Sequence, residues 1–121
     1  MKAKEFVDKY YLHDSLFDKV SFSKEDAVVS MIIDFAFWMQ SWYEEGKAET
    51  GLISVTFNNV EDYSCPESVE WEQISILQAE ESDGVVKFSL MNDIEDSYLE
   101  MKIKSDDIVV EILDNCEVQQ S

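Results

Sequence analysis

Apolar and polar residues alternate along most of the chain, which is the spacing of strands and not of helices. The longest example is AVVSMIIDFAFWMQ, residues 27–40, where the odd positions from Val29 to Met39 are all apolar and the even positions are mixed. A strand of this kind covers a core with one face and leaves the other face partly wet. Its β-branched and aromatic side chains favour a strand over a buried helix.

Further segments show the same strand-like pattern. They are residues 16–22, 52–60, 69–80, 85–90, 98–103 and 108–113. Residues 69–80 do not hold one phase, which a β-bulge or an irregular start would explain. Turns rich in Asp, Asn and Ser separate the strands, and residues 61–68 are predicted to form a loop. Strands joined this closely must pair antiparallel, because a parallel crossover needs about a dozen residues.

A helical pattern is confined to the start of the chain. Within residues 2–11, Phe6 and Tyr10 lie four positions apart, as do Val7 and Tyr11. Residues at this spacing share one face of a helix, so the sequence predicts a short N-terminal helix with an apolar stripe.

Together these elements predict a mainly β fold. We expect an antiparallel β-sandwich or open barrel of about seven strands with a short N-terminal helix, an α+β arrangement being the alternative. The length fits a single domain over residues 1–121, with residues 113–121 as a flexible tail.

The charge restricts the possible partners. The chain has 27 acidic residues and nine basic ones, all of them lysine, for a formal charge of −18. Such a field repels nucleic acid and anionic lipid, and without arginine the chain lacks the planar group that grips phosphate. A basic protein is the partner that this field would attract, although the charge could also serve solubility alone.

The predicted location is the cytoplasm. No apolar run reaches the roughly 20 residues of a membrane span, and the charged start MKAKEFVDKYY contains no signal-peptide core. Cys65 and Cys116 are too few for a disulfide scaffold and fit no zinc spacing, so we expect reduced thiols.

His13, the chain's single histidine, precedes Asp14 and Ser15, so the three residue types of a hydrolase triad occur together. A triad needs the histidine between nucleophile and acid, and three consecutive residues do not normally adopt that order. We therefore predict that these residues form a turn or cap between helix and strand, with His13 donating to a backbone carbonyl or a neighbouring carboxylate. A surface contact through His13 is the alternative.

Other catalytic and metal-binding patterns are weak. Residues 92–100 carry alternating acids like a calcium loop but lack the glycine of its sharp turn. Asp34 interrupts the long apolar run. It would be a general acid if covered, but alternation places it on the mixed, wetter face. We expect no metal, no cofactor and no enzymatic activity.

Aromatic and acidic residues gather after the longest strand. These residues are Trp38, Trp42, Tyr43, Glu44 and Glu45, with Asp34 nearby. Tryptophan and tyrosine beside acids are typical of an interface that binds a cationic partner. The alternative is that they cap the end of the core.

The order of five motifs, LHDSLFDKVSF, IDFAFW, VTFNNV, FSLMND and LEMKIKSDDIVVEI, resembles a group of small, acidic, β-rich bacterial proteins. This group includes immunity proteins of polymorphic toxin systems. The resemblance implies a cytoplasmic, non-catalytic protein that neutralises a toxin by binding it.

Three functions follow as hypotheses. The first is a non-enzymatic binding protein that presents an acidic surface to a basic partner such as a toxin domain. The second is a small-ligand-binding or enzymatic β-barrel with a pocket around Asp34 and His13. The third is a subunit of a homo-oligomer that associates through a strand edge or a patch at Trp38 and Trp42.

Overall fold

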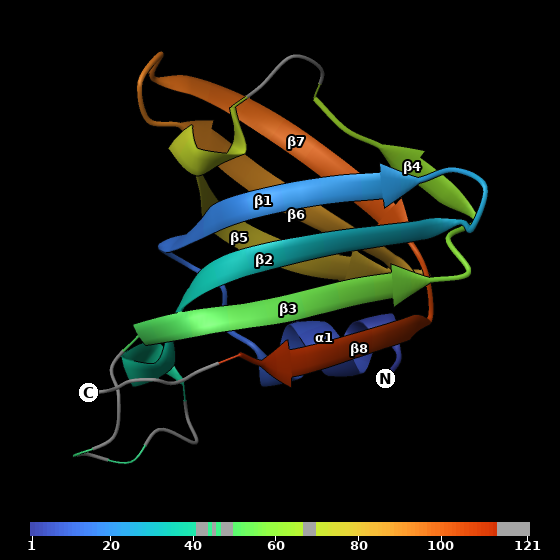
Figure 1. The fold of residues 1–121 in the computed structure, drawn as a ribbon, viewed down its shortest axis with the longest axis horizontal. Helices are drawn as coiled ribbons and strands as arrows, with labels where there is room; N and C mark the ends of the chain where they lie inside the picture. Colours follow the sequence, from blue (N-terminus) through green and yellow to red (C-terminus); the bar gives the residue numbers. More distant parts are fainter. Residues whose placement is uncertain (41–43, 45, 47–49, 67–69, 114–121) are drawn as a thin grey trace.

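In a computed structural model, the chain forms a mainly β fold with a short N-terminal helix (Figure 1). The structure describes residues 1–40, 44, 46, 50–66 and 70–113. The strands in this part of the chain belong to one open sheet, in which neighbouring strands pair antiparallel. The prediction of an antiparallel, mainly β fold is confirmed, with eight strands in the described residues instead of about seven.

Short connections link most of the elements. The helix is α1 (Ala3–Lys9), and two 3-10 turns are η1 (Phe37–Met39) and η2 (Trp71–Gln73). The strands are β1 (Ser15–Ser23), β2 (Val28–Ala36), β3 (Thr50–Asn58), β4 (Asp62–Ser64), β5 (Ile74–Ser82), β6 (Val85–Asn92), β7 (Ser97–Lys104) and β8 (Asp107–Ile112).

The sheet folds over itself. Its strand order is β4-β7-β6-β5-β1-β2-β3-β8, and β1 pairs with β5 through two residues of each strand before the two diverge. Figure 1 shows β1, β2, β3 and β8 in front of β5, β6 and β7. The two halves meet inside, where the rings of Phe57 and Phe88 lie 6.3 Å apart. The fold therefore has the facing layers of a sandwich, made from the halves of one sheet.

The core follows the predicted alternation. The inward residues of three strands are fully or almost fully buried: Val29, Met31, Ile33 and Phe35 of β2, Ile53, Val55 and Phe57 of β3, and Val86, Phe88 and Leu90 of β6. The phase fades in β8, where Ile108 is buried but Ile112 is 57% exposed. Because β8 is an edge strand, its last residues have a sheet neighbour on one side only.

Helix α1 places one side of its apolar stripe in the core. Phe6 is buried with its ring 5.8 Å from that of Phe57, and the Tyr10 ring lies 5.9 Å from that of Phe35. Tyr11 remains 53% exposed. The helix is shorter at both ends than predicted, and it contacts β5, β6 and β8.

The prediction of a strand over residues 27–40 is wrong at its end. β2 stops at Ala36, and the next three residues form η1. The cause is Gln40, whose buried side chain accepts from the Tyr11 N–H (2.8 Å) and donates to the carbonyls of Tyr11 (2.7 Å) and Ala36 (2.9 Å). These bonds hold the chain in a turn that an extended strand could not make.

The predicted loop over residues 61–68 contains β4, so that prediction is wrong for three residues. Too short to show an alternating pattern, β4 forms by pairing with β7. β5 begins at Ile74, after η2, and its register shifts between Ile76 and Gln78. The sequence predicts either a β-bulge or an irregular start for residues 69–80, and the structure has both.

The residue that follows β8 is still bonded to the neighbouring strand β3. The Leu113 N–H donates to the Leu52 carbonyl at 2.9 Å, so the first residue of the predicted tail is bonded to the sheet. The rest of that tail, residues 114–121, lies outside the described residues.

Candidate functional site

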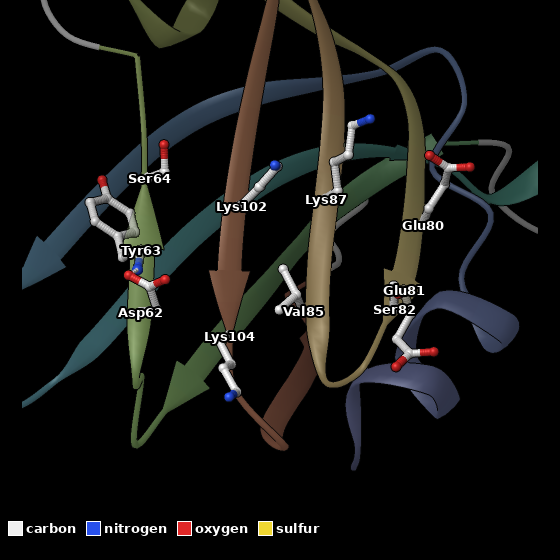
Figure 2. Close-up of a pocket in the computed structure, with 10 residues that line it drawn as sticks. All are labelled: Asp62, Tyr63, Ser64, Glu80, Glu81, Ser82, Val85, Lys87, Lys102 and Lys104. Carbon is white, nitrogen blue, oxygen red and sulfur yellow. Dashed lines mark hydrogen bonds between the residues drawn. The ribbon is translucent and has the colours of Figure 1, made fainter.

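A hollow of about 480 Å³ lies on the outer face of the sheet half formed by β4, β7, β6 and β5 (Figure 2). Most of the side chains that line it point outward from these strands, and three of them are lysines, Lys87, Lys102 and Lys104. The chain has nine lysines in all, so a third of its basic residues are gathered here. We call this the lysine hollow.

Strand register sets the order of charges across the lysine hollow. Lys87 of β6 and Lys102 of β7 are direct cross-strand partners, an arrangement in which like charges destabilise a sheet. Asp62 of β4 stands opposite Lys104, and Glu80 of β5 stands opposite Lys87. Figure 2 shows the lysines between these two acidic borders. A basic centre is thus flanked by acids on both sides.

Lys87 is held by a short chain of contacts. Its Nζ lies 3.3 Å from Glu100 Oε2, and the Tyr98 hydroxyl donates to the same oxygen at 2.9 Å. The bond with Glu100 raises the pKa of Lys87, while the bonds from Tyr98 and Lys87 lower the pKa of Glu100. Both groups therefore stay charged at neutral pH, and the contacts mainly orient the lysine, since exposed ion pairs stabilise little.

The other two lysines differ in their contacts. Lys104 Nζ lies 3.9 Å from Glu61 Oε1. Lys102 is exposed, and its ammonium makes no hydrogen bond or ion pair with the residues that the structure describes. The lysine that stands opposite Lys87 therefore has donors to offer a ligand.

A second charged feature occupies the end of the molecule where four turns meet, on the right in Figure 1. These turns join β1 to β2, β3 to β4, β5 to β6 and β7 to β8. They carry eight carboxylates in or next to them: Glu25, Asp26, Glu61, Asp62, Glu81, Asp83, Asp106 and Asp107. We call this the acidic end. Asp62 and Glu81 also line the lysine hollow, so the two features adjoin.

Backbone bonds connect these turns. The Val60 N–H donates to the Ala27 carbonyl (2.9 Å), and the Ser105 N–H donates to the Gly84 carbonyl (3.2 Å). Gly84 follows Asp83, and both have positive φ, as the two-residue turn of a hairpin requires. The carboxylates of the acidic end are therefore presented by turns of defined shape.

His13, Asp14 and Ser15 lie in the connection between α1 and β1. His13 Nδ1 donates to the Leu77 carbonyl at 2.7 Å, and its Nε2 lies 3.5 Å from Asp14 Oδ2. The Asp14 N–H donates to the Ile76 carbonyl at 2.9 Å. The Ser15 hydroxyl is buried without a hydrogen-bond partner in the described residues. The serine is thus not bonded to the imidazole, as a nucleophile would be.

The hollow beside His13 does not include Asp34 among the described residues that line it. This second hollow, of about 490 Å³, lies between α1 and β5. Asp34 is exposed on the outer face of β2, where partial burial of its carboxyl and the charge of Asp18 raise its pKa. A pocket lined by both Asp34 and His13 stays a prediction.

The predicted aromatic and acidic interface falls mostly outside the described part of the chain. Trp42, Tyr43 and Glu45 lie outside the described residues, as does the side chain of Trp38. Glu44 is described and exposed. The interface at these residues stays a prediction.

Sequence reasoning missed the lysine hollow, although part of its signal was present. Lys87 and Lys102 precede or follow inward residues of β6 and β7, so alternation already places them on the outer faces. Their gathering depends on which strands are neighbours, which alternation does not reveal.

Two further observations bear on chemistry. Within residues 1–40, 44, 46, 50–66 and 70–113, no three His, Cys, Asp or Glu side chains are grouped to hold a metal ion. None of the helices in that same part is both long and apolar enough to cross a bilayer.

Comparison with known proteins assigns no family. No family model, curated protein or solved structure matches this chain.

Proposed function

We propose that this chain is a non-enzymatic binding protein that recognises a basic protein through its acidic end, in the manner of an immunity-type inhibitor. The observation that carries the proposal is the convergence of four turns with eight carboxylates at one end of the molecule. Carboxylates gathered at one end of the molecule attract a cationic surface.

The charge count supports the same partner. With 27 acids and nine lysines, pairing every lysine with a different carboxylate would still leave 18 carboxylates without one. A field of this sign steers basic proteins into contact and repels nucleic acid, whose binding requires neutralised phosphates. We therefore expect fast association that slows steeply as salt rises.

The test is affinity capture from a lysate of the source organism at low salt, followed by a rising salt gradient. One variant removes four charges from the acidic end, Glu25→Gln, Asp26→Asn, Asp83→Asn and Asp107→Asn. Its matched control removes four charges from the opposite ends of the strands, Glu70→Gln, Glu72→Gln, Glu95→Gln and Asp96→Asn. We expect a basic protein to be retained by the wild type and the control, and lost by the first variant.

Loss from both variants would show that the net charge and not the acidic end binds the partner. Retention by both would show that the four carboxylates of the acidic end are not needed, which contradicts the proposal. The inhibitor part of the proposal is tested next by expressing the captured protein alone and with this chain. Toxicity that co-expression relieves supports it, and toxicity that persists contradicts it.

A further inference from the structure

The centre of the lysine hollow places two cations opposite each other. Lys87 and Lys102 face each other directly across two strands, and like charges in this position destabilise the pair. Glu100 pairs with Lys87 and also interacts electrostatically with Lys102, and Glu61 lies near Lys104. The Lys102 ammonium itself makes no hydrogen bond or ion pair with the described residues. An anion that reaches Lys102 would therefore meet an ammonium whose N–H donors are available.

The lining of the hollow restricts that anion. Val85, the cross-strand partner of Lys104, is a partly buried apolar residue, which suits a short aliphatic stem. Asp62 and Glu80 stand at the two borders, where they disfavour a multiply charged anion such as phosphate and favour cations. An Asp or Glu side chain fits this lining, because its short aliphatic stem can lie against Val85 and it carries a single negative charge. Basic residues next to it would lie against the two acidic borders.

We propose that the lysine hollow binds an Asp or Glu side chain of the basic partner, on a segment where basic residues flank that acid. The inference rests on the proposed function, since the partner is the same. It adds one acidic side chain of the partner, within the partner's basic surface, that contacts Lys102 of this chain. Lys102 donates to the carboxylate, and the flanking cations lie against Asp62 and Glu80. Such a reversed charge fixes the orientation of the partner, which a uniform acidic surface does not.

The experiment uses two peptides and NMR titration of the labelled chain at low salt. One peptide is acetyl-Lys-Gly-Glu-Gly-Lys-amide, and the other has Gln in place of Glu. General attraction to a chain of charge −18 predicts tighter binding of the Gln peptide, because it carries one positive charge more. The lysine hollow predicts the reverse order. We expect the Glu peptide to bind about threefold more tightly, with amide shifts centred on β6 and β7.

A pair of variants separates the hollow from the overall charge. Lys102→Gln should abolish the preference for the Glu peptide. Lys19→Gln changes the net charge equally but lies exposed on β1, in the other half of the sheet, and should keep the preference. Unchanged amide dispersion in both variants confirms that the fold is retained.

Equal or tighter binding of the Gln peptide at β6 and β7 would overturn the inference, as would an unchanged preference in Lys102→Gln. These results are independent of capture through the acidic end. Loss of the peptide preference with normal capture contradicts the lysine hollow alone, whereas failed capture with a retained preference contradicts the proposed function alone.

Discussion

Phe22 of β1 stacks on Tyr63 of β4, with ring centroids 4.3 Å apart and ring planes inclined by 8°. Three strands separate β1 from β4 in the sheet order, so this contact joins the two halves of the folded sheet. β1 therefore begins paired with β5 and ends against the far edge of the sheet. At this contact, burial raises the pKa of Tyr63, and the hydrogen bond with Cys65 raises it further.

A double-mutant cycle on Phe22→Ala and Tyr63→Ala should give a coupling free energy of about 1 kcal/mol, because stacked rings gain energy beyond their buried area. Urea unfolding of the four proteins measures it. The control cycle uses Tyr98→Ala in place of Tyr63→Ala, because Tyr98 is an exposed tyrosine of β7. We expect almost no coupling free energy between Tyr98→Ala and Phe22→Ala. Equal coupling in both cycles would contradict a specific contact.

Ser15→Ala should raise the free energy of unfolding by about 1 kcal/mol, because the buried hydroxyl has no partner in the described residues and loses its hydration on folding. The comparison is Ser21→Ala at an exposed position of β1, where we expect little change. Chemical denaturation measures both. If the Ser15 hydroxyl served as a cap, the alanine variant would be less stable than the wild type.

Gln40→Leu should lower the free energy of unfolding by about 3 kcal/mol. The substitution keeps side-chain bulk but removes the bonds to the N–H and carbonyl of Tyr11 and to the carbonyl of Ala36, and unpaired backbone groups are costly when buried. Gln78→Leu, at an exposed position of β5, is the matched control. A similar small effect for both substitutions would exclude Gln40 as the residue that holds the turn.

Asp34→Asn should stabilise the protein at neutral pH and lose this effect as the pH falls towards 3.8, the ordinary pKa of the group. Folding raises the pKa of Asp34, so the folded state binds the proton more tightly and the ionised carboxylate destabilises it above the folded pKa. Unfolding curves across this pH range test the sign. Glu111→Gln, at an exposed position of β8, measures the general gain in stability from removing one negative charge. An equal pH dependence in both variants would refute the local effect.

The alternating pattern predicted the faces of β2, β3 and β6 because side-chain direction in a strand depends on its own period of two. It failed at Gln40, where a side chain replaces a strand neighbour by bonding the backbone of Tyr11, a residue 29 positions away. It also missed β4, whose three residues form a strand only because β7 lies beside them.

The sequence by itself determined a mainly β, antiparallel chain with an N-terminal helix and a charge of −18, because composition, hydrophobic period and short turns are local properties. Only the tertiary structure decided that Phe22 meets Tyr63, that four turns gather their carboxylates at one end, and that Lys87 stands opposite Lys102. These features depend on which distant strands pair and in which register. That choice is made by packing of the whole core, and no single segment contains it.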